Sequence, residues 1–400
     1  MTTNHKEIRF VVGVGRAAVL LAGLALSIWM QPVEAQVTHR YTSSGPAAYF
    51  VALATPGCTT NATPQCPWVV SAIKNSADKL QVIAWHDTGA GIEQTDSKIA
   101  DSIVFDLGIA PFGSNMVVTA NLNSSFNLEL ITWQVSATGA LSRLKTLNTT
   151  QGATTVAISG PLDPGCNCVA TVTDSNAELT LNVWFIDPIT GAITAGPTMT
   201  GASTTSVWIA ASGGEEFWTL ISNKSGDMEL TAWHYYSGSL VKYGTATGPA
   251  YSSAALSYSG PGVNDYALYS ASIDSATDEQ VIAWTTTFGV GQTPVDSGGA
   301  KGASVSLASP YFRNRIGLAS AGYPISAFGN GAGNLEIDFG TYPSGAALKL
   351  SKFTCATPVS GVAIASEDPA FRAQTTVDVV VGYIAPGNGN LQMGVYQVTF

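Results

Sequence analysis

An alternating pattern of apolar and polar positions recurs along most of the chain, and each clear copy ends in tryptophan. Six residues such as those at 80–85 alternate between Leu, Val or Ile and small or polar side chains, and a glycine-containing turn follows. Two weaker copies end at 340 and 396, so that neighbouring copies are between 48 (85 to 133) and 56 (284 to 340) residues apart. The tryptophans that end the clear copies are Trp85, Trp133, Trp184, Trp233 and Trp284. A period of this length indicates a repeat architecture.

Each period divides into four short strands separated by turn-forming residues. The second period predicts strands over 103–109, 116–120, 128–135 and 141–147, with Gly, Pro and Asn between them. Both alternation sets of the third strand are apolar, which indicates that both faces of each sheet are covered by neighbouring sheets. Four antiparallel strands per period, in seven periods, predict an all-β fold, a seven-bladed β-propeller.

The last period supplies three strands, at 362–366, 377–384 and 391–400. We expect the strand at 37–42 to complete this last blade as its fourth strand, which closes the ring and covers a sheet edge. A parallel β-helix has a much shorter repeat, and an array of β-sandwiches would not keep one tryptophan every fifty residues or so. Both alternatives are therefore disfavoured.

The first 35 residues have the composition of an export signal. Lys6, Arg9 and Arg16 precede the charge-free run 17–30, and Val33-Glu34-Ala35 suits cleavage before residue 36. The run is shorter than the ~20 residues of a membrane-spanning helix, although an uncleaved anchor is the alternative. We expect residues 36–400 to form one domain, exported to the periplasm, the cell surface or the medium, with no later transmembrane segment.

The repeat resembles that of bacterial exported seven-bladed β-propeller proteins with no assigned activity. In these proteins Leu-x-(Leu/Val)-x-x-Trp, then Gly-x-(Leu/Ile), recurs in each blade, as in 128–133 with 139–141 here. The resemblance extends over all seven copies, but it concerns the scaffold and implies no activity. The chain has no WD40 Gly-His and Trp-Asp pair, no recurring double-glycine pattern of the kelch type and no Ser-x-Asp-x-Gly box of the sialidases.

Charge and histidine usage exclude several classes of function. The net charge is −10 and only 11% of residues are charged, and an acidic chain without a basic stripe disfavours nucleic acid and anionic membranes as partners. His86 and His234 follow the repeat tryptophan on two blades that are predicted to lie far apart around the ring, and His39 lies in the N-terminal strand. No set of residues has the spacing of metal ligands. We predict no metal, no cofactor and no catalytic triad, and we expect a monomer.

Five cysteines in an exported chain predict disulfides. Two loops share the motif Pro-Gly-Cys followed by a second cysteine, which predicts Cys58–Cys66 and Cys166–Cys168. The second pair is sterically tight and needs a turn at Asn167. Cys355 is left over, and we expect a buried free thiol.

The loops between the first and second strands of each blade, the A–B loops, are the predicted binding surface, because several are longer than strand pairing requires. Three of the few arginines of this part of the chain lie there beside aromatic residues, a composition that suits an anion, a carboxylate-bearing glycan or a protein partner. Ion pairs with nearby acids such as Glu367 and Asp368 are the structural alternative. The predicted ligand-binding residues are Tyr311, Phe312, Arg313, Arg315, Phe371, Arg372 and Trp68.

Three functions stay open at this stage. The first is a binding propeller that recognises a glycan or an extracellular protein through the A–B loops. The second is a polysaccharide hydrolase or lyase that uses loop carboxylates, which needs two of them to converge. The third is a structural scaffold. The carboxylates concerned are Asp163, Glu215, Glu216, Asp265, Glu367 and Asp368. The repeat tryptophans are predicted to be core residues and not sugar-stacking platforms.

Overall fold

The computed structural model describes residues 36–56, 68–160, 166–211, 216–236, 238–251, 253–258, 266–273, 279–285, 291–294, 302–308, 325–341, 349–366 and 376–399. The regular structure in these ranges is β-strand apart from one 3₁₀ turn, Ser175–Ala177. The all-β prediction is therefore confirmed. No helix in this part of the chain is long and apolar enough to cross a membrane.

The strands form five antiparallel sheets of four strands and one sheet of seven strands. Within each four-stranded sheet, strands that follow one another in sequence are neighbours in space, which is the order expected when each period folds onto itself. The first of these sheets has β5 (Leu107–Phe112), β6 (Met116–Leu122), β7 (Asn127–Val135) and β8 (Leu141–Gly152), and the second has β9 (Val156–Ser159), β10 (Cys168–Thr173), β11 (Glu178–Ile186) and β12 (Ile193–Ser203). The third has β13 (Val207–Ala211), β14 (Glu216–Ser222), β15 (Asp227–Tyr236) and β16 (Ser239–Ala250), and the fourth has β17 (Ser253–Tyr258), β18 (Tyr266–Ile273), β19 (Glu279–Thr285) and β20 (Gly291–Pro294). The fifth has β21 (Gly302–Ala308), β22 (Ile325–Asn330), β23 (Asn334–Thr341) and β24 (Lys349–Pro358).

The seven-stranded sheet joins the two ends of the described chain. Its order is β25 (Val362–Ser366), β26 (Thr376–Ile384), β27 (Asn390–Thr399), β1 (Gln36–Ala54), β2 (Trp68–Asn75), β3 (Lys79–Asp87) and β4 (Ile92–Ile103). The first part of β1 pairs with β27 from Gln36↔Thr399 to Ala47↔Asn390, and the second part pairs with β2 from Ala48 to Ala54. One continuous strand therefore belongs to two neighbouring four-stranded units, where a separate strand at 37–42 was predicted.

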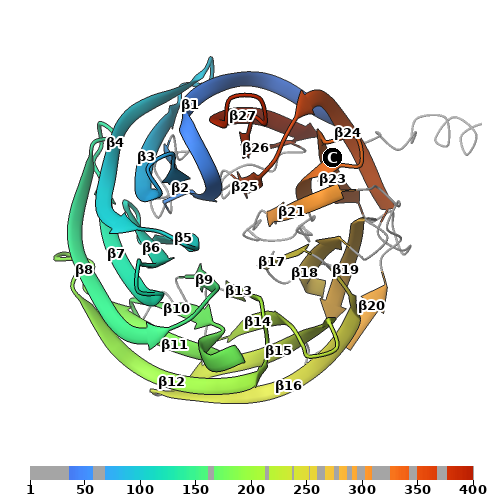
Figure 1. Cartoon of the computed structure of the whole chain (residues 1–400). Helices are drawn as coiled ribbons and strands as arrows, with labels where there is room; N and C mark the ends of the chain where they lie inside the picture. The colour runs from blue at the N-terminus through green and yellow to red at the C-terminus, as the bar shows by residue number, and fades with distance from the viewer. Residues whose placement is uncertain are drawn as a thin grey trace, which may run out of the picture. The chain divides into compact units, whose positions relative to one another are not determined.

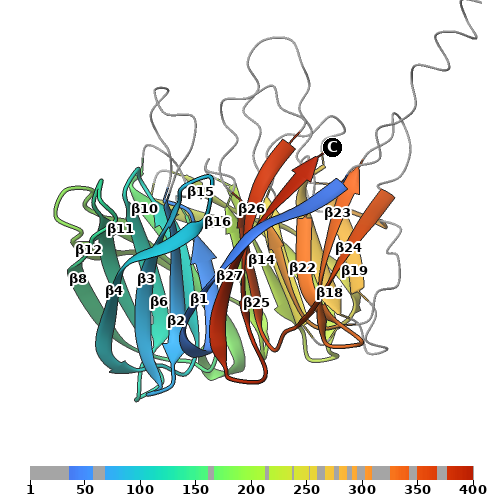
Figure 2. The same cartoon turned by 90° about the horizontal axis from the view of Figure 1, so that it is seen from above.

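The sheets are arranged around a common axis, and the first strand of each lies nearest to it (Figure 1). Seen at right angles to that view, the strands run roughly along the axis (Figure 2). Because the strands of a sheet alternate in direction, the A–B and third-to-fourth (C–D) connections leave one end of each sheet, called here the A–B face. The second-to-third (B–C) connections and the links between sheets leave the other end, the B–C face. This arrangement is typical of a β-propeller.

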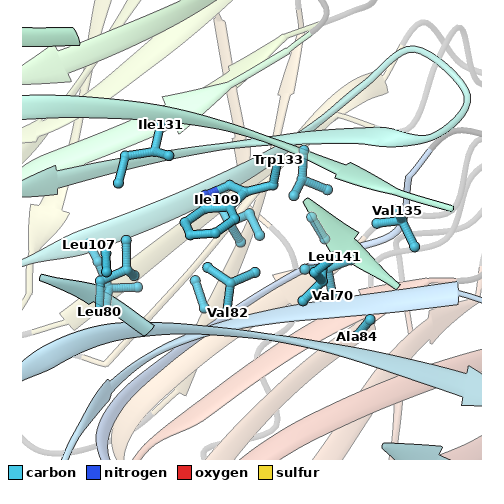
Figure 3. Packing of buried hydrophobic residues seen from close by; sticks show 14 of the residues in the cluster. Val70, Leu80, Val82, Ala84, Leu107, Ile109, Ile131, Trp133, Val135 and Leu141 are labelled. Carbon is cyan, nitrogen blue, oxygen red and sulfur yellow. The ribbon is translucent and has the colours of Figure 1, made fainter. Parts of the chain in front are cut away.

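Apolar residues of neighbouring sheets form the core. Val70, Leu80 and Val82 of the first unit pack against Ile131 and Trp133 of the next (Figure 3). The other face of the same sheet, with Ile83 and Trp85, packs against residues of β27 such as Val395. The prediction that both faces are buried is confirmed for this sheet. The five repeat tryptophans are at most 5% exposed, so their assignment to the core is confirmed as well.

A hydrogen bond from each repeat tryptophan recurs in five sheets. The indole N–H of Trp133 donates to Oγ1 of Thr119 on the neighbouring strand at 3.0 Å, and that of Trp85 donates to Oγ of Ser71 at 2.9 Å. The other three pairs are Trp184–Thr171, Trp233–Thr219 and Trp284–Ser270, at 2.8–2.9 Å. The hydroxyl on the second strand thus satisfies the one polar atom that each buried tryptophan brings into the core.

Two strand boundaries of the second period were wrong. The predicted strand 103–109 is divided, since β4 ends at Ile103 and β5 begins at Leu107. Between them Asp106 accepts hydrogen bonds from the N–H groups of Leu107 (2.9 Å), at the start of β5, and Val156 (2.8 Å), at the start of β9. Pro111, predicted in a turn, lies inside β5, where it is tolerated because β5 is an edge strand.

Candidate functional site

Most of the predicted ligand-binding residues lie outside the described residues. These are Tyr311, Phe312, Arg313, Arg315, Phe371 and Arg372, and their role stays a prediction. Trp68 is described at the start of β2, where its ring stacks on His86 with the centroids 4.6 Å apart. The same ring packs against Gly139 in the β7–β8 turn of the next sheet. Trp68 is therefore half-buried between two sheets at the A–B face.

The structure confirms one of the two predicted disulfides. Cys166 and Cys168 are bonded across Asn167, whose φ of 48° makes the turn that so short a loop requires. Cys58 and Cys66 lie outside the described residues. Cys355 on β24 is a free thiol, half-buried where full burial was expected, with its Sγ 3.1 Å from Oγ1 of Thr357.

The described residues contain no group of three or more His, Cys, Asp or Glu side chains that could hold a metal ion. Of the six loop carboxylates considered for catalysis, only Glu216 is described, at the first position of β14. The other five lie outside the described ranges, so their convergence stays untested.

A cavity lies near the common axis of the sheets. It has a volume of about 420 Å³ and is lined by the first strands of several sheets, mainly by small and aliphatic residues such as Val51, Ala157 and Ala363. Asp106 is the carboxyl group among these lining residues. Burial raises its pKa to about 6, although two backbone N–H groups hold the carboxylate. Its oxygens are thus engaged in the link between two sheets.

An exposed aromatic cluster stands on the A–B face at the β15–β16 hairpin. Tyr236 and Tyr243 are 61% and 58% exposed, and the ring of His234 lies between them. The His234 ring is 5.8 Å from that of Tyr236, nearly parallel to it, and 5.2 Å from that of Tyr243. The Tyr243 hydroxyl is 3.2 Å from Nδ1 of His234. The three residues form what we call the hairpin cluster.

A β-bulge places Tyr243 in this cluster. The register between β15 and β16 shifts between Ala232 and Trp233, which leaves Tyr243 as the extra residue on β16. Bulges of this kind redirect a side chain without ending the strand pairing. The sequence reasoning missed the cluster, and the available signal was the run of aromatic residues at 234–236 beyond the repeat tryptophan.

Comparisons with known proteins show the fold and nothing finer. No family model matches the chain, and no curated protein matches it. Among solved structures, it is similar to the hydrazine synthase of Kuenenia stuttgartiensis, with 10% identity, a TM-score of 0.56, and coverage of 91% of this chain and 98% of the other. A putative 6-phosphogluconolactonase from Bacteroides fragilis has 15% identity, a TM-score of 0.51, and coverage of 77% and 85%.

A third similar structure is AofleA from Arthrobotrys oligospora, with 12% identity, a TM-score of 0.50, and coverage of 85% of this chain and 94% of the other. Such neighbours are propeller-like proteins, but at identities this low the likeness concerns the fold alone. The chain has the all-β, propeller-like fold of these structures.

Proposed function

We propose that the protein is an exported, seven-bladed β-propeller that binds a carbohydrate on its A–B face and does not turn it over. The observation that carries this proposal is the hairpin cluster, in which two tyrosine rings are more than half exposed beside a histidine ring. The pairing of β1 with both β27 and β2 supports a ring that is closed by the N-terminal strand.

The chemistry of the hairpin cluster favours a sugar over a charged ligand. Tyrosine offers an apolar ring on which the C–H face of a sugar can lie and a hydroxyl that can bond to the sugar's own hydroxyl groups. The turn joining the two strands and the neighbouring residues add Ser239 and Lys242, both exposed, at the rim. A surface of this kind binds by stacking and hydrogen bonds, and none of its side chains is a carboxylate that could act as acid or base.

Binding without turnover is favoured because two of the described carboxylates on this face are engaged by backbone N–H groups. Asp187 in the β11–β12 turn accepts hydrogen bonds from the N–H groups of Ile189 and Thr190, which lowers its pKa. Asp96 accepts one from Leu141 of the next sheet at 2.7 Å. These groups hold turns together, and a hydrolase or lyase is therefore the alternative outcome of the test and not a second proposal.

The test is a glycan array combined with a depolymerisation assay on purified residues 36–400. Tyr236→Ser with Tyr243→Ser removes both exposed rings, and we expect affinity to fall about ten-fold, since each aromatic contact contributes roughly 0.5–1.5 kcal/mol. The matched control is Ile189→Ser, which removes an 85% exposed apolar side chain from the C–D turn of another sheet. We expect it to bind as the unchanged protein does.

Each of the other results has a defined meaning. Release of shortened chains from any polysaccharide would refute binding without turnover and direct attention to the loop carboxylates. Loss of binding on Arg313→Ala with Arg372→Ala, but not on the tyrosine changes, would place the site on the predicted loops and refute the hairpin cluster. Absence of binding to every glycan would refute carbohydrate recognition, and a protein partner would then be sought.

A further inference from the structure

A second exposed aromatic surface lies on the B–C face, far along the sheets from the hairpin cluster. Phe126 in the β6–β7 turn and Phe105 in the link between β4 and β5 stack with their centroids 4.2 Å apart and their planes at 16°. They are 45% and 38% exposed. The pair stands at the boundary of two sheets and belongs to none of the described core clusters.

The backbone of Phe126 has a conformation that a bulky side chain rarely adopts. Its φ is +59°, in the left-handed region, which favours glycine. The turn is of a type that recurs, with the N–H of its fourth residue donating to the carbonyl of an asparagine three residues earlier. Two other sheets place Gly226 and Gly333 at the same position, with φ of +81° and +77°.

Two further sheets have Asp78 (φ 60°) and Ala177 (φ 59°) at this position, so Phe126 is the bulkiest side chain among the five equivalent turns. A strained residue is kept where something other than stability needs it, so an outlier of this kind points to a function. The ring adds little core packing in return, because almost half of its surface faces solvent.

A groove of about 740 Å³ opens directly beside Phe126. Gly152 and Ala153 line it with minimal side chains, and Asn176, itself at φ +55°, and Thr205 line it from the following sheet and the link to the next one. Asn176 and Thr205 are exposed. The groove therefore combines one aromatic wall, small residues, and amide and hydroxyl groups.

The groove presents no charge of its own. Asp174 is the titratable residue that lines it, and this side chain is buried and accepts hydrogen bonds from the N–H groups of Thr154 (2.7 Å) and Thr155 (2.8 Å) and from the Thr154 hydroxyl. Its acceptor capacity is used to hold the link between two sheets. A ligand that needed a counter-ion would find none in the groove.

The aromatic surface continues away from the groove towards β1 and β2 of the preceding, seven-stranded sheet. Lys74 lies over the ring of Phe105, with its Nζ 5.8 Å from the centroid, and 6.0 Å from the centroid of Phe50. Asp78 neutralises this ammonium group at 3.0 Å. Phe50 is 47% exposed. A row of rings from Phe50 through Phe105 to Phe126 therefore leads into the groove, which suits an extended ligand more than a single small molecule.

We propose that this groove and the row of phenylalanines beside it form a second binding site, for a neutral carbohydrate chain. The apolar face of a sugar unit lies on Phe126, and its hydroxyl groups bond to Asn176 and Thr205. The following units extend along the edge of Phe105, whose faces are covered by Phe126 and Lys74, towards Phe50. This site is independent of the hairpin cluster, because the two lie on opposite faces of the sheets and share no residue.

The experiment is affinity gel electrophoresis of purified residues 36–400 through gels that contain laminarin, glucomannan or arabinoxylan, with alginate as an acidic polysaccharide. We expect retardation by at least one of the three neutral polysaccharides. Phe126→Gly removes the ring and introduces the residue found at the equivalent positions 226 and 333. Affinity should therefore fall at least ten-fold while the melting temperature does not fall. Phe126→Asn, which also tolerates positive φ, is the second variant in case the glycine change impairs folding.

Ile189→Ser, which removes an exposed apolar side chain on the other face, serves as the control and leaves this binding unchanged. Comparing Phe126→Gly with Tyr236→Ser then assigns the binding to this groove or to the hairpin cluster. The proposal is overturned if no neutral polysaccharide retards the protein, if only alginate does, or if both Phe126 variants bind as tightly as the unchanged protein. Binding that is lost with Tyr236→Ser but kept with Phe126→Gly would also overturn it.

Discussion

The indole hydrogen bond of Trp133 allows a quantitative prediction of stability. Trp133 is 1% exposed and Thr119 is fully buried, and their hydrogen bond of 3.0 Å joins two neighbouring strands inside the core. Thr119→Val keeps the shape of the side chain and replaces the acceptor hydroxyl by a methyl group. A buried donor that loses its acceptor costs about 1–3 kcal/mol, so the free energy of unfolding should fall by that amount.

The corresponding change in melting temperature is small but measurable. An unfolding entropy of about 2.1 cal/mol/K per residue over roughly 360 residues amounts to about 0.76 kcal/mol/K, so the melting temperature should fall by about 1–4 °C. Urea denaturation followed by tryptophan fluorescence gives the free energy directly. Thr247→Val is the matched control, because Thr247 is an exposed threonine on β16, and its stability should stay within about 0.5 kcal/mol.

A double-mutant cycle separates the hydrogen bond from the change in packing. Trp133→Phe removes the donor and some ring volume, and combining it with Thr119→Val leaves neither partner unpaired. The loss in the double variant should be smaller than the sum of the two single losses by about 1 kcal/mol. The reasoning is refuted if Thr119→Val is as stable as the Thr247→Val control, or if the two single losses simply add.

Two further predictions concern the links between sheets. Burial raises the pKa of Asp106 to about 6 from 3.8, so its contribution to stability is fully present below about pH 4 and is lost as the pH rises through 6. The unfolding free energy of the unchanged protein minus that of Asp106→Asn should therefore fall between pH 4 and pH 7. A difference that stays constant over this range would contradict the reasoning. Deleting residues 36–46 removes the strand that pairs with β27 and exposes a sheet edge, so we expect a lower melting temperature and concentration-dependent association in analytical ultracentrifugation. A monomeric deletion variant with an unchanged melting temperature would argue against ring closure by this strand.

The sheet architecture could be predicted from the sequence because each period repeats the same burial. The third strand of every clear copy carries apolar residues on both faces and ends in a buried tryptophan, and few folds other than a propeller bury a four-stranded sheet in this way. The boundary near Ile103 was not predictable from alternation, since the apolar pattern continues across the link. There a single side chain, Asp106, holds the starts of β5 and β9 through two backbone hydrogen bonds.

The candidate surfaces were harder to predict because they depend on backbone details. A bulge in β16 brings Tyr243 to His234. Alternation alone assumes a regular register between β15 and β16, so it cannot predict this contact. Phe126 looks like an ordinary apolar residue in the sequence. Its meaning becomes visible only when its turn is aligned with those that end in Gly226 and Gly333, which requires the positive φ values of the structure.

Both candidate surfaces are places where one sheet departs from the repeat. The positions that hold the sheets together obey it closely, as the five tryptophans with their hydroxyl acceptors show. At Phe126 an exposed ring stands where the equivalent turns have smaller residues such as Gly226 and Ala177. Tyr243 is an exposed ring in a bulge at which β4 and β8 have Thr95 and Leu144. Departures of this kind lower local stability or regularity and leave the core untouched, so selection for folding alone does not account for them. Contact with a ligand is the physical explanation that we offer for both surfaces, which stand on sheets whose core the buried tryptophans stabilise.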